Sequence, residues 1–458
     1  MAQNPTFAFV TIGSGSYLGS TIRDLTLAHS LYKRGFKVVI YWMLEHNPDL
    51  VINGIEQRIL CYGTRYQFKQ PSEFLDRIVG PLLSFFPKGW RTNIVQNIPG
   101  FVDRLLQNLM RSLYTESDPD PSLVKRLLKY VELDGVTHLM MSFGSISPLA
   151  LEVKKLCKVP LDYLVTFQGD EQFADFAAKA GLLQNYRRRL DEAVRNSGWP
   201  AIAISRDYLQ RLVTELGLDP NCFRVIYNGI DLPKQEQRLP FSILKTAFPK
   251  VRQDDAQDGA IVTFIGRQES EKGIDLLLYA AKLLAVRGVH LQLVICGSTA
   301  KGRSYQKVIN DLTSHLKLVI NHSGAVSFEV RDALYAHSRC IVYPSVDREA
   351  FGLVVAEAMS QGTPVLVPDI GGVTEVIQHG NIAGGLTFKT WDSADLARQL
   401  ERLLKDDDLH AELAANTRAL AARFSAEHMA NNILEHLNLS LNRRFGEEYG
   451  STSRVRAS

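Results

Sequence analysis

Two cations stand close together near a glycine in the second half of the sequence. Arg267 and Lys272 lie five residues apart in the segment GRQESEKG, which follows an apolar run. An arginine fork and a lysine point charge at the carboxyl end of a buried strand can hold a diphosphate, because ligands of parallel sheets bind at that edge. The alternative is an ordinary surface segment, since Lys-Gly often precedes a helix.

Two glutamates, Glu349 and Glu357, are separated by seven residues further along the chain. Gly352 ends a loop, so we expect a helix to begin near Leu353 and the amides of Phe351, Gly352 and Leu353 to form an anion-binding helix start. Glu357 then lies among apolar residues, where a carboxylate is unfavourable unless it binds a partner such as the vicinal diol of a ribose. A solvent-facing glutamate at the helix edge is the alternative.

A glycine-rich turn, GSGSYLG, follows the first apolar run of the chain. The glycines Gly13 and Gly15 would let a ligand approach the backbone, and the helix start that follows favours an anion. Two features argue against interpreting this turn as a dinucleotide-binding motif. The third glycine comes one residue later than in G-x-G-x-x-G, and the second strand does not end on an acidic residue that could bind a ribose. A tight turn without a ligand stays the alternative.

The elements that position these residues alternate between strand and helix. Stretches of helical period, such as Asp24–Arg34, lie between most of the apolar runs, and this alternation predicts α/β domains with parallel sheets. The predicted strands are Phe7–Ile12, Lys37–Trp42, His138–Ser142, Pro160–Thr166, Ala201–Ser205, Phe223–Ile226, Ala260–Ile265, Leu291–Cys296, Cys340–Tyr343 and Pro364–Val367.

The proline-containing and polar stretch before the seventh predicted strand divides the chain into two doubly wound, Rossmann-like domains. We place the N-terminal domain at 1–233, the linker at 234–259 and the C-terminal domain at 260–425. The final segment, 426–458, is predicted to be a helix and a frayed tail that cross back to the first domain. An insert at 63–114 interrupts the first domain.

Composition excludes several classes of protein. The 458 residues are 45% hydrophobic and 22% charged, which argues against disorder. Lys plus Arg is 52 and Asp plus Glu is 49, a balance that argues against nucleic acid as the main partner. Five cysteines without a C-x-x-C pair suggest neither a zinc site nor disulfides, and we expect no signal peptide or membrane-spanning segment.

The cysteine pattern and the expected absence of a signal peptide and a membrane-spanning segment together predict a cytoplasmic protein.

The insert 63–114 is basic and rich in aromatic and apolar residues. Such an insert can lie on an anionic membrane, which would place the protein peripherally at the inner membrane face, or form the wall of a cleft. A pair of ordinary helices with their arginines in water is the alternative.

The combined motifs resemble the retaining glycosyltransferases of the GT-B fold, the large group-one family, which is family four of the glycosyltransferase classification. The resemblance covers most of the chain and is strongest from Val225 to Val376. The matching pieces are Tyr227-Asn228-Gly229-Ile230-Asp231, Gly266-Arg267 with Lys272-Gly273, Glu349 with Glu357, and Gly362-Thr363-Pro364-Val365 leading to Gly371-Gly372 and Glu375.

The resemblance implies a sugar transfer from a nucleotide-diphosphate sugar, held by the second domain, to a small-molecule, lipid or glycan acceptor held by the first. It assigns Arg267 and Lys272 to the donor diphosphate, Glu349 to the donor sugar and Glu357 to the ribose. The remaining implied binding residues are Gly13, Gly15, Ser16, Phe351, Gly352 and Leu353. No metal or other cofactor is implied, because fixed cations and helix dipoles stabilise the leaving diphosphate.

One departure concerns the first domain, where many relatives carry a His-Gly and this chain has Gln168-Gly169. Gln168 can hydrogen-bond the sugar but cannot act as a base, and Asp170 either replaces that function or caps the next helix.

Asp118 and Asp120 match the D-x-D motif of metal-dependent transferases, but we interpret them as part of a surface loop. A sugar phosphorylase, a nucleotide-sugar epimerase and a non-catalytic sugar-nucleotide-binding protein are the other functions left open.

Overall fold

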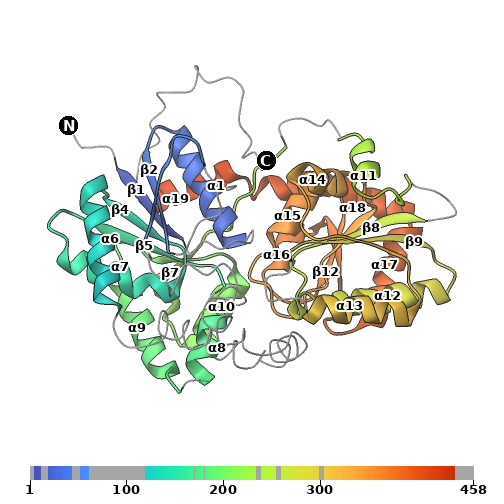
Figure 1. Cartoon of the computed structure of the whole chain (residues 1–458), viewed down its shortest axis with the longest axis horizontal. Helices are drawn as coiled ribbons and strands as arrows, with labels where there is room; N and C mark the ends of the chain where they lie inside the picture. The colour runs from blue at the N-terminus through green and yellow to red at the C-terminus, as the bar shows by residue number, and fades with distance from the viewer. Residues whose placement is uncertain are drawn as a thin grey trace, which may run out of the picture.

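Two parallel β-sheets with helices on both faces lie side by side in the computed structural model of the chain (Figure 1). This arrangement is the predicted fold class. The residues that the structure describes are 5–11, 19–43, 52–60, 119–169, 171–179, 181–233, 239–253, 259–298 and 304–438.

The sheet of the first domain has the order β3-β2-β1-β4-β5-β6-β7, and all neighbouring strands are parallel. All six strands predicted for this domain are present. β3 is not predicted because its sequence EQRI has no apolar run and its side chains are partly exposed at the sheet edge. The strands are β1 (Thr6–Thr11), β2 (Lys37–Trp42), β3 (Glu56–Ile59), β4 (His138–Met141), β5 (Asp162–Phe167), β6 (Ala201–Ala203) and β7 (Phe223–Val225).

The sheet of the second domain has the order β10-β9-β8-β11-β12-β15 and is also parallel. The four predicted strands form its centre, whereas the two edge strands, β10 and β15, are short and partly polar and are not predicted. The strands are β8 (Ala260–Ile265), β9 (Leu291–Cys296), β10 (Ile320–His322), β11 (Cys340–Val342), β12 (Val365–Pro368) and β15 (Gly385–Phe388), with a small antiparallel pair, β13 (Gln378–His379) and β14 (Ile382–Ala383).

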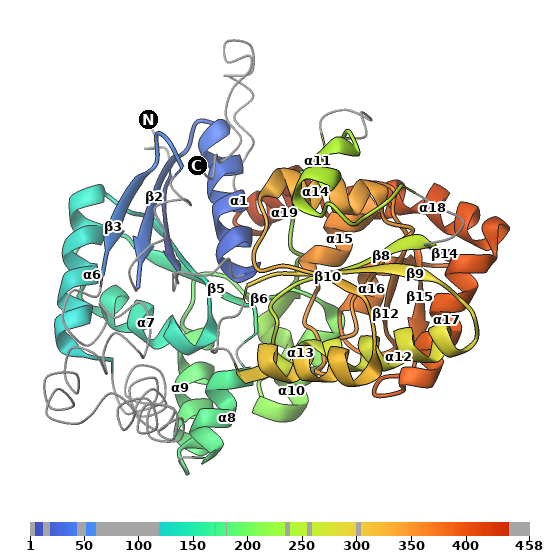
Figure 2. The same cartoon turned by 45° about the vertical axis from the view of Figure 1, so that its right-hand side comes forward.

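Helices connect the strands and cover both faces of each sheet, as Figure 2 shows from a second direction. The first domain has α1 (Gly19–Lys33), α6 (Pro121–Asp134), α7 (Ser147–Leu156), α8 (Glu171–Lys179), α9 (Leu183–Arg195) and α10 (Arg206–Leu216). The later helices are α11 (Ser242–Ala247), α12 (Ile274–Val286), α13 (Ser304–Leu316), α14 (Phe328–His337), α15 (Leu353–Ser360), α16 (Val373–Ile377), α17 (Ser393–Lys405), α18 (Asp407–Ala422) and α19 (Ala426–His436).

Alternation along β8 divides the core of the second domain between its two faces. Val262 and Phe264 pack in one cluster with α12 and α17, whereas Ile261 and Ile265 pack in another with α14 and α15. Because successive side chains of a strand point to opposite faces, one apolar run can bury both layers. The short helix α11 lies within the predicted linker and packs against α14.

The C-terminal helices cross back to the first domain, as the sequence predicts. α17 and α18 pack on the second domain, but α19 packs against α1, and its Met429 and Ile433 share a cluster with Phe7 and Leu31. A backbone bridge fixes the crossing, because the amide of Ala426 donates to the carbonyl of Ile230 at 2.8 Å. The second half of the chain therefore contributes a layer to the first domain (Figure 1).

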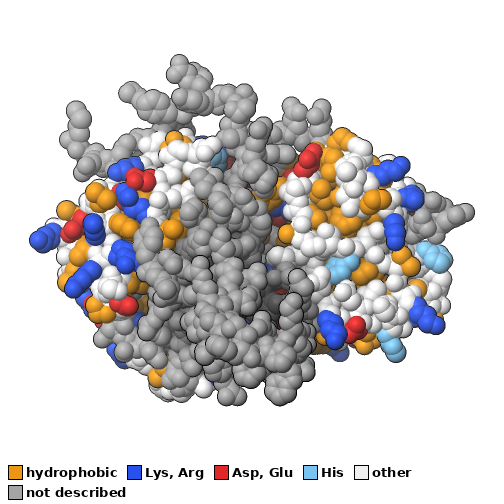
Figure 3. Space-filling model, viewed as in Figure 1, with side chains coloured by type: hydrophobic (Ala, Val, Ile, Leu, Met, Phe, Trp, Pro, Cys, Tyr) orange, Lys and Arg blue, Asp and Glu red, His pale blue; other side chains and the backbone are white. Residues whose placement is uncertain are grey.

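Charged side chains of both signs are interspersed on the described parts of the face in Figure 3. Within the described residues, no helix is both long enough and apolar enough to cross a membrane. The insert 63–114, with its predicted membrane or cleft contact, lies outside the described residues.

Candidate functional site

The loop after β8 meets the loop after β11 at the carboxyl edge of the second sheet, and a glycine makes this contact close. Gly273 has a φ of 62°, and a β-carbon there would lie 2.0 Å from the carbonyl oxygen of Pro344. Only glycine fits such a contact without moving the backbone. The turn therefore places the preceding residue, Lys272, against the residues that follow β11.

Lys272, Tyr343 and Glu349 form a buried cluster at this edge. The ammonium nitrogen of Lys272 lies 2.5 Å from Glu349 Oε2 and donates to the Tyr343 hydroxyl at 3.0 Å. The Tyr343 hydroxyl donates to the same Glu349 oxygen at 2.8 Å. The structure thus brings together two of the residues predicted for the site, and it adds a tyrosine from the end of a predicted strand.

Electrostatics stabilise the charged forms in this cluster. Burial alone would raise the pKa of Glu349, but the charge of Lys272 and its hydrogen bond outweigh burial and hold that pKa below its usual value. Burial likewise opposes the charge on Lys272, and Glu349 and Tyr343 nevertheless raise the pKa of this ammonium. Burial raises the pKa of the Tyr343 hydroxyl, which stays protonated and can donate.

Arg267 lies at the end of β8, where the sequence predicts it, and it has carboxylate partners. Its guanidinium forms an ion pair with Glu269 and a second, at 3.4 Å, with Glu271. Arg267 also contributes to the lowered pKa of Glu349, so the two side chains belong to one electrostatic environment. Neither predicted phosphate-binding cation is therefore an isolated charge, and an entering diphosphate would compete with carboxylates for both.

The helix that follows Glu349 begins at the predicted residue. α15 starts at Leu353, and Gly352 has the left-handed φ of 86° that ends the preceding loop. The first amides of a helix have no acceptor within it, so the backbone from Phe351 to Leu353 forms a start that favours anions. A β-carbon on Gly19, the first residue of α1, would meet Leu353 Cδ1 at 3.4 Å. The starts of α1 and α15 therefore face each other between the domains.

The Gly371-Gly372 pair holds the backbone of Glu349. The amide of Gly372 donates to the Glu349 carbonyl at 2.8 Å. A β-carbon on Gly371 would lie 2.7 Å from the same carbonyl, so a side chain there would displace it. This part of the predicted motif consequently fixes the loop from which the Glu349 carboxylate projects.

Glu357 also has protein partners, which the sequence does not predict. Its carboxylate accepts from the Tyr335 hydroxyl at 2.9 Å and from Arg331 Nη1 at 3.2 Å. Arg331 pairs in addition with Asp332 at 2.8 Å. The expectation that a carboxylate on this apolar helix needs a partner is met by α14, and a ribose would have to share the carboxylate with these two side chains.

Gln168 is the predicted first-domain residue that the structure describes. It follows β5, and its amide nitrogen donates to Asp24 Oδ1 and to the Ser142 carbonyl, both at 3.1 Å. The other predicted residues of this region, Gly13, Gly15, Ser16, Asp118 and Asp170, lie outside the described residues. Asp120 caps the start of α6, where it accepts from the amide of Ser122 at 2.8 Å, as expected of a residue in a surface loop.

The domains contact each other directly beside Glu349. The hydroxyl of Ser205 donates to the Ala350 carbonyl at 2.6 Å, and Arg348 pairs with Asp207 at 2.6 Å. Glu375, which belongs to the predicted motif, accepts from the amide of Asp207 at 2.8 Å and so caps α10 of the first domain. The loop that carries Glu349 is therefore also an interdomain contact.

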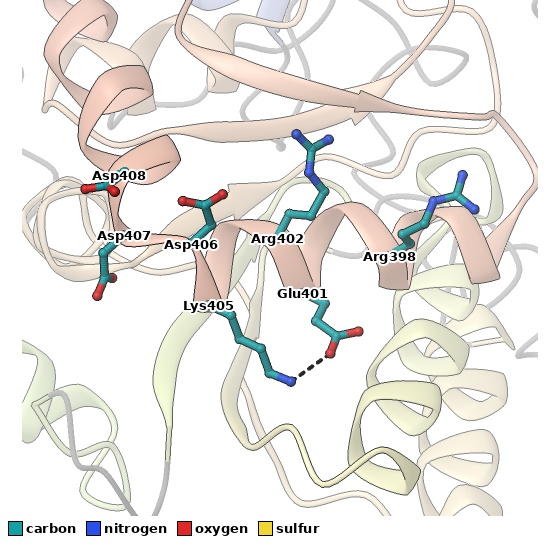
Figure 4. A pocket seen from close by; sticks show the side chains of 7 residues that line it. All are labelled: Arg398, Glu401, Arg402, Lys405, Asp406, Asp407 and Asp408. Carbon is teal, nitrogen blue, oxygen red and sulfur yellow. Dashed lines mark hydrogen bonds and ion pairs between the residues drawn. The ribbon is translucent and has the colours of Figure 1, made fainter.

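A hollow on α17 and α18 lies outside the predicted site. Its side chains are charged, and Glu401 pairs with Lys405 at 2.8 Å (Figure 4). Asp406 ends α17 and caps α18, where it accepts from the amide of Leu409. These contacts stabilise helix ends.

Comparisons with known proteins support the resemblance. Residues 248–420 match the family described as Glycosyl transferases group 1. The D-inositol 3-phosphate glycosyltransferase of Nocardioides sp. is 31% identical over 239 residues, which cover 49% of this chain and 50% of that protein. The α-D-kanosaminyltransferase of Streptomyces kanamyceticus is 30% identical over 37% of this chain and 42% of its own. The chain thus spans about half the length of the curated relatives it matches.

Solved structures resemble the whole chain. Anabaena HepE in complex with UDP and glucose has a TM-score of 0.69 at 16% identity, over 95% of this chain and 100% of its own. Sucrose-phosphate synthase from Thermosynechococcus elongatus has a TM-score of 0.69 at 19% identity, over 95% and 98%. At such identities the likeness shows the fold. These findings bear out the resemblance to group-one GT-B glycosyltransferases, because residues 248–420 match the group 1 family and the chain shares the fold of the solved structures.

Proposed function

We propose that the chain transfers a sugar from a nucleotide-diphosphate sugar to an acceptor held by the first domain, with retention of the anomeric configuration and without a metal ion. The cluster of Lys272, Tyr343 and Glu349 carries the proposal. It joins an ammonium and a carboxylate at the carboxyl edge of a parallel sheet, next to the helix start at Leu353.

The donor lies against the second domain in this proposal. Its diphosphate binds Arg267, Lys272 and the first amides of α15, its sugar hydroxyls bind Glu349, and its ribose binds Glu357. HepE, which shares the fold, is solved with UDP and with UDP-glucose, so a uridine nucleotide is the first to test.

Leaving-group stabilisation is the main catalytic contribution of these residues. Negative charge develops on the diphosphate as the sugar leaves, and an ammonium held in place beforehand stabilises that charge without reorganisation. Glu349 and Tyr343 hold Lys272 in such a position. The acceptor hydroxyl attacks from the same face as the leaving phosphate, which takes the proton as the group-one family implies.

The test is the initial rate of nucleotide release from UDP-, GDP- and ADP-sugars with a panel of acceptors, followed by NMR of the anomeric proton. Acceptor-dependent release and a product with the donor's configuration support the proposal. Release that requires inorganic phosphate indicates a phosphorylase, and donor binding without any release indicates a non-catalytic binding protein.

A further inference from the structure

A second polar cluster is buried at the carboxyl edge of the first sheet. Asp24 of α1 accepts from Arg23 Nη1 at 3.0 Å, from Gln168 Nε2 at 3.1 Å and from the Ser142 hydroxyl. Asp24 and Arg23 are each about 1% exposed. We call Arg23, Asp24, Ser142 and Gln168 the Asp24 cluster.

The cluster fixes the orientation of the Gln168 amide. Both groups near Gln168 Nε2, the Asp24 carboxylate and the Ser142 carbonyl, are acceptors, so the NH₂ end must face them. The amide oxygen then points elsewhere, and it is buried without a hydrogen-bond partner. Buried amide oxygens are normally paired, so this one is suited to accept from a ligand hydroxyl.

One edge of the Arg23 guanidinium, formed by Nε and Nη2, makes no hydrogen bond within the protein. Nη1 binds Asp24, whereas Nε and Nη2 are buried and have no hydrogen-bond partner. The Nε–H and Nη2–H bonds of a guanidinium run parallel, and this fork matches two oxygens of a phosphate or carboxylate. A buried charged group left half unsatisfied is unfavourable, so the edge points to an anionic partner.

The position of the cluster suits a substrate. β1 lies between β2 and β4, so the chain reverses its direction across the sheet at β1, where ligands of such folds bind. Ser142 and Gln168 follow β4 and β5 at this edge. Arg23 lies four residues, or about 6 Å along the helix, from Gly19, which faces Leu353 of the second domain.

We propose that the Asp24 cluster binds an acceptor in which a hydroxyl stands near a phosphate group. The acceptor hydroxyl donates to Gln168 Oε1, and the Nε–Nη2 edge of Arg23 donates to the phosphate. Asp24 is a positioning residue that holds both side chains. This inference rests on the proposed function, because it names the class of acceptor for that reaction.

Binding of matched probes to the full chain tests the inference by isothermal titration calorimetry. The pairs are glycerol with glycerol 3-phosphate, sorbitol with sorbitol 6-phosphate, and glucose with glucose 6-phosphate. We expect at least one phosphorylated probe to bind at least tenfold more tightly than its neutral partner, and Arg23→Gln to abolish the preference. Lys33→Gln removes a positive charge from the exposed end of the same helix and should retain the preference. The inference is wrong if no phosphorylated probe is preferred, or if Arg23→Gln keeps the preference.

A second variant keeps the test decisive if Arg23→Gln does not fold. Gln168 is partly exposed, and Gln168→Glu keeps the size of the side chain while adding a negative charge beside the expected phosphate. The preference for the phosphorylated probe should fall at least tenfold. An unchanged preference in a folded Gln168→Glu variant contradicts the inference.

UDP binding by the same variants separates the acceptor from the donor. A UDP affinity within twofold of wild type in Arg23→Gln or Gln168→Glu supports an acceptor site. If UDP affinity instead falls together with the preference for phosphorylated probes, the contact belongs to the donor and the inference is overturned. If the wild-type chain binds no nucleoside diphosphate, the proposed function fails, and the phosphate preference still decides whether the Asp24 cluster binds such a ligand.

Discussion

The two polar clusters, one at the carboxyl edge of each sheet, differ in how their hydrogen-bonding capacity is used. In the second domain, Lys272 and Glu349 neutralise each other and Tyr343 bonds to both. In the first domain, Arg23 keeps a two-donor edge, and the Gln168 oxygen has no protein partner. The comparison suggests that the protein itself satisfies the hydrogen bonds of the cluster in the second domain, whereas a ligand completes those of the cluster in the first domain.

The largest expected effect is the loss of a cation in the second domain. Lys272→Ala and Arg267→Ala should each lower the rate of nucleotide release on the order of a hundredfold or more, because each removes positive charge from the leaving diphosphate. Lys245→Ala, on the exposed side of α11, is the matched control and should retain the wild-type rate. Full activity in both site variants would refute the assignment of Lys272 and Arg267 to the donor diphosphate.

Glu357→Gln has the next largest expected effect. If the carboxylate binds the ribose, donor affinity should fall by about 1.5–3 kcal/mol, the range for hydrogen bonds to charged groups. Tyr335→Phe removes one protein hydrogen bond to the same carboxylate and should change donor affinity less. Calorimetry with UDP makes the comparison, and an unchanged affinity in Glu357→Gln would leave the carboxylate with a structural role only.

The ion pair in the second cluster should also influence stability in acid. The pKa of Glu349 is lowered in the folded chain, so its stabilising contribution is present above the ordinary pKa of glutamate and is lost as the pH falls through the lower folded value. Urea unfolding between about pH 6 and pH 3 should therefore show a steeper loss of stability for wild type than for Glu349→Gln. Equal slopes for the two proteins would show that Glu349 is not linked to acid unfolding.

Chelation should have the smallest effect. The proposed cations and the α15 start supply the positive potential at the diphosphate, so excess EDTA and the Asp118→Ala, Asp120→Ala double variant should leave the initial rate unchanged. If EDTA stops nucleotide release and Mn²⁺ or Mg²⁺ restores it, the account of the leaving group is wrong even though the fold is right.

Local sequence patterns predict the second domain's cluster better than the first domain's. Lys272, Glu349 and the start of α15 follow from glycines, charges and apolar runs that lie within short segments. Asp24 and Gln168 are 144 residues apart, and only the sheet order brings them together. A single sequence contains no local signal for such a contact.

The missed elements have a similar explanation. The edge strands β3 and β10 are short and polar, so they lack the apolar runs that predict the central strands. Arg331 and Tyr335 contact Glu357 from another helix, and nothing in their own segment indicates that partner. A run of apolar residues predicts that a strand is buried on both faces, whereas pairing between distant polar groups depends on the completed fold.

Nucleotide-dependent stabilisation of the full chain tests the central claim most directly. Thermal and urea unfolding should be measured with UDP, GDP and ADP, for wild type and for Lys272→Ala. A nucleotide at 100 times its dissociation constant should add about 2.7 kcal/mol to the free energy of unfolding of wild type, and clearly less at the same concentration to that of Lys272→Ala. The account predicts this result for at least one of the three nucleotides. Absence of stabilisation by all three, or equal stabilisation of both proteins, would contradict it.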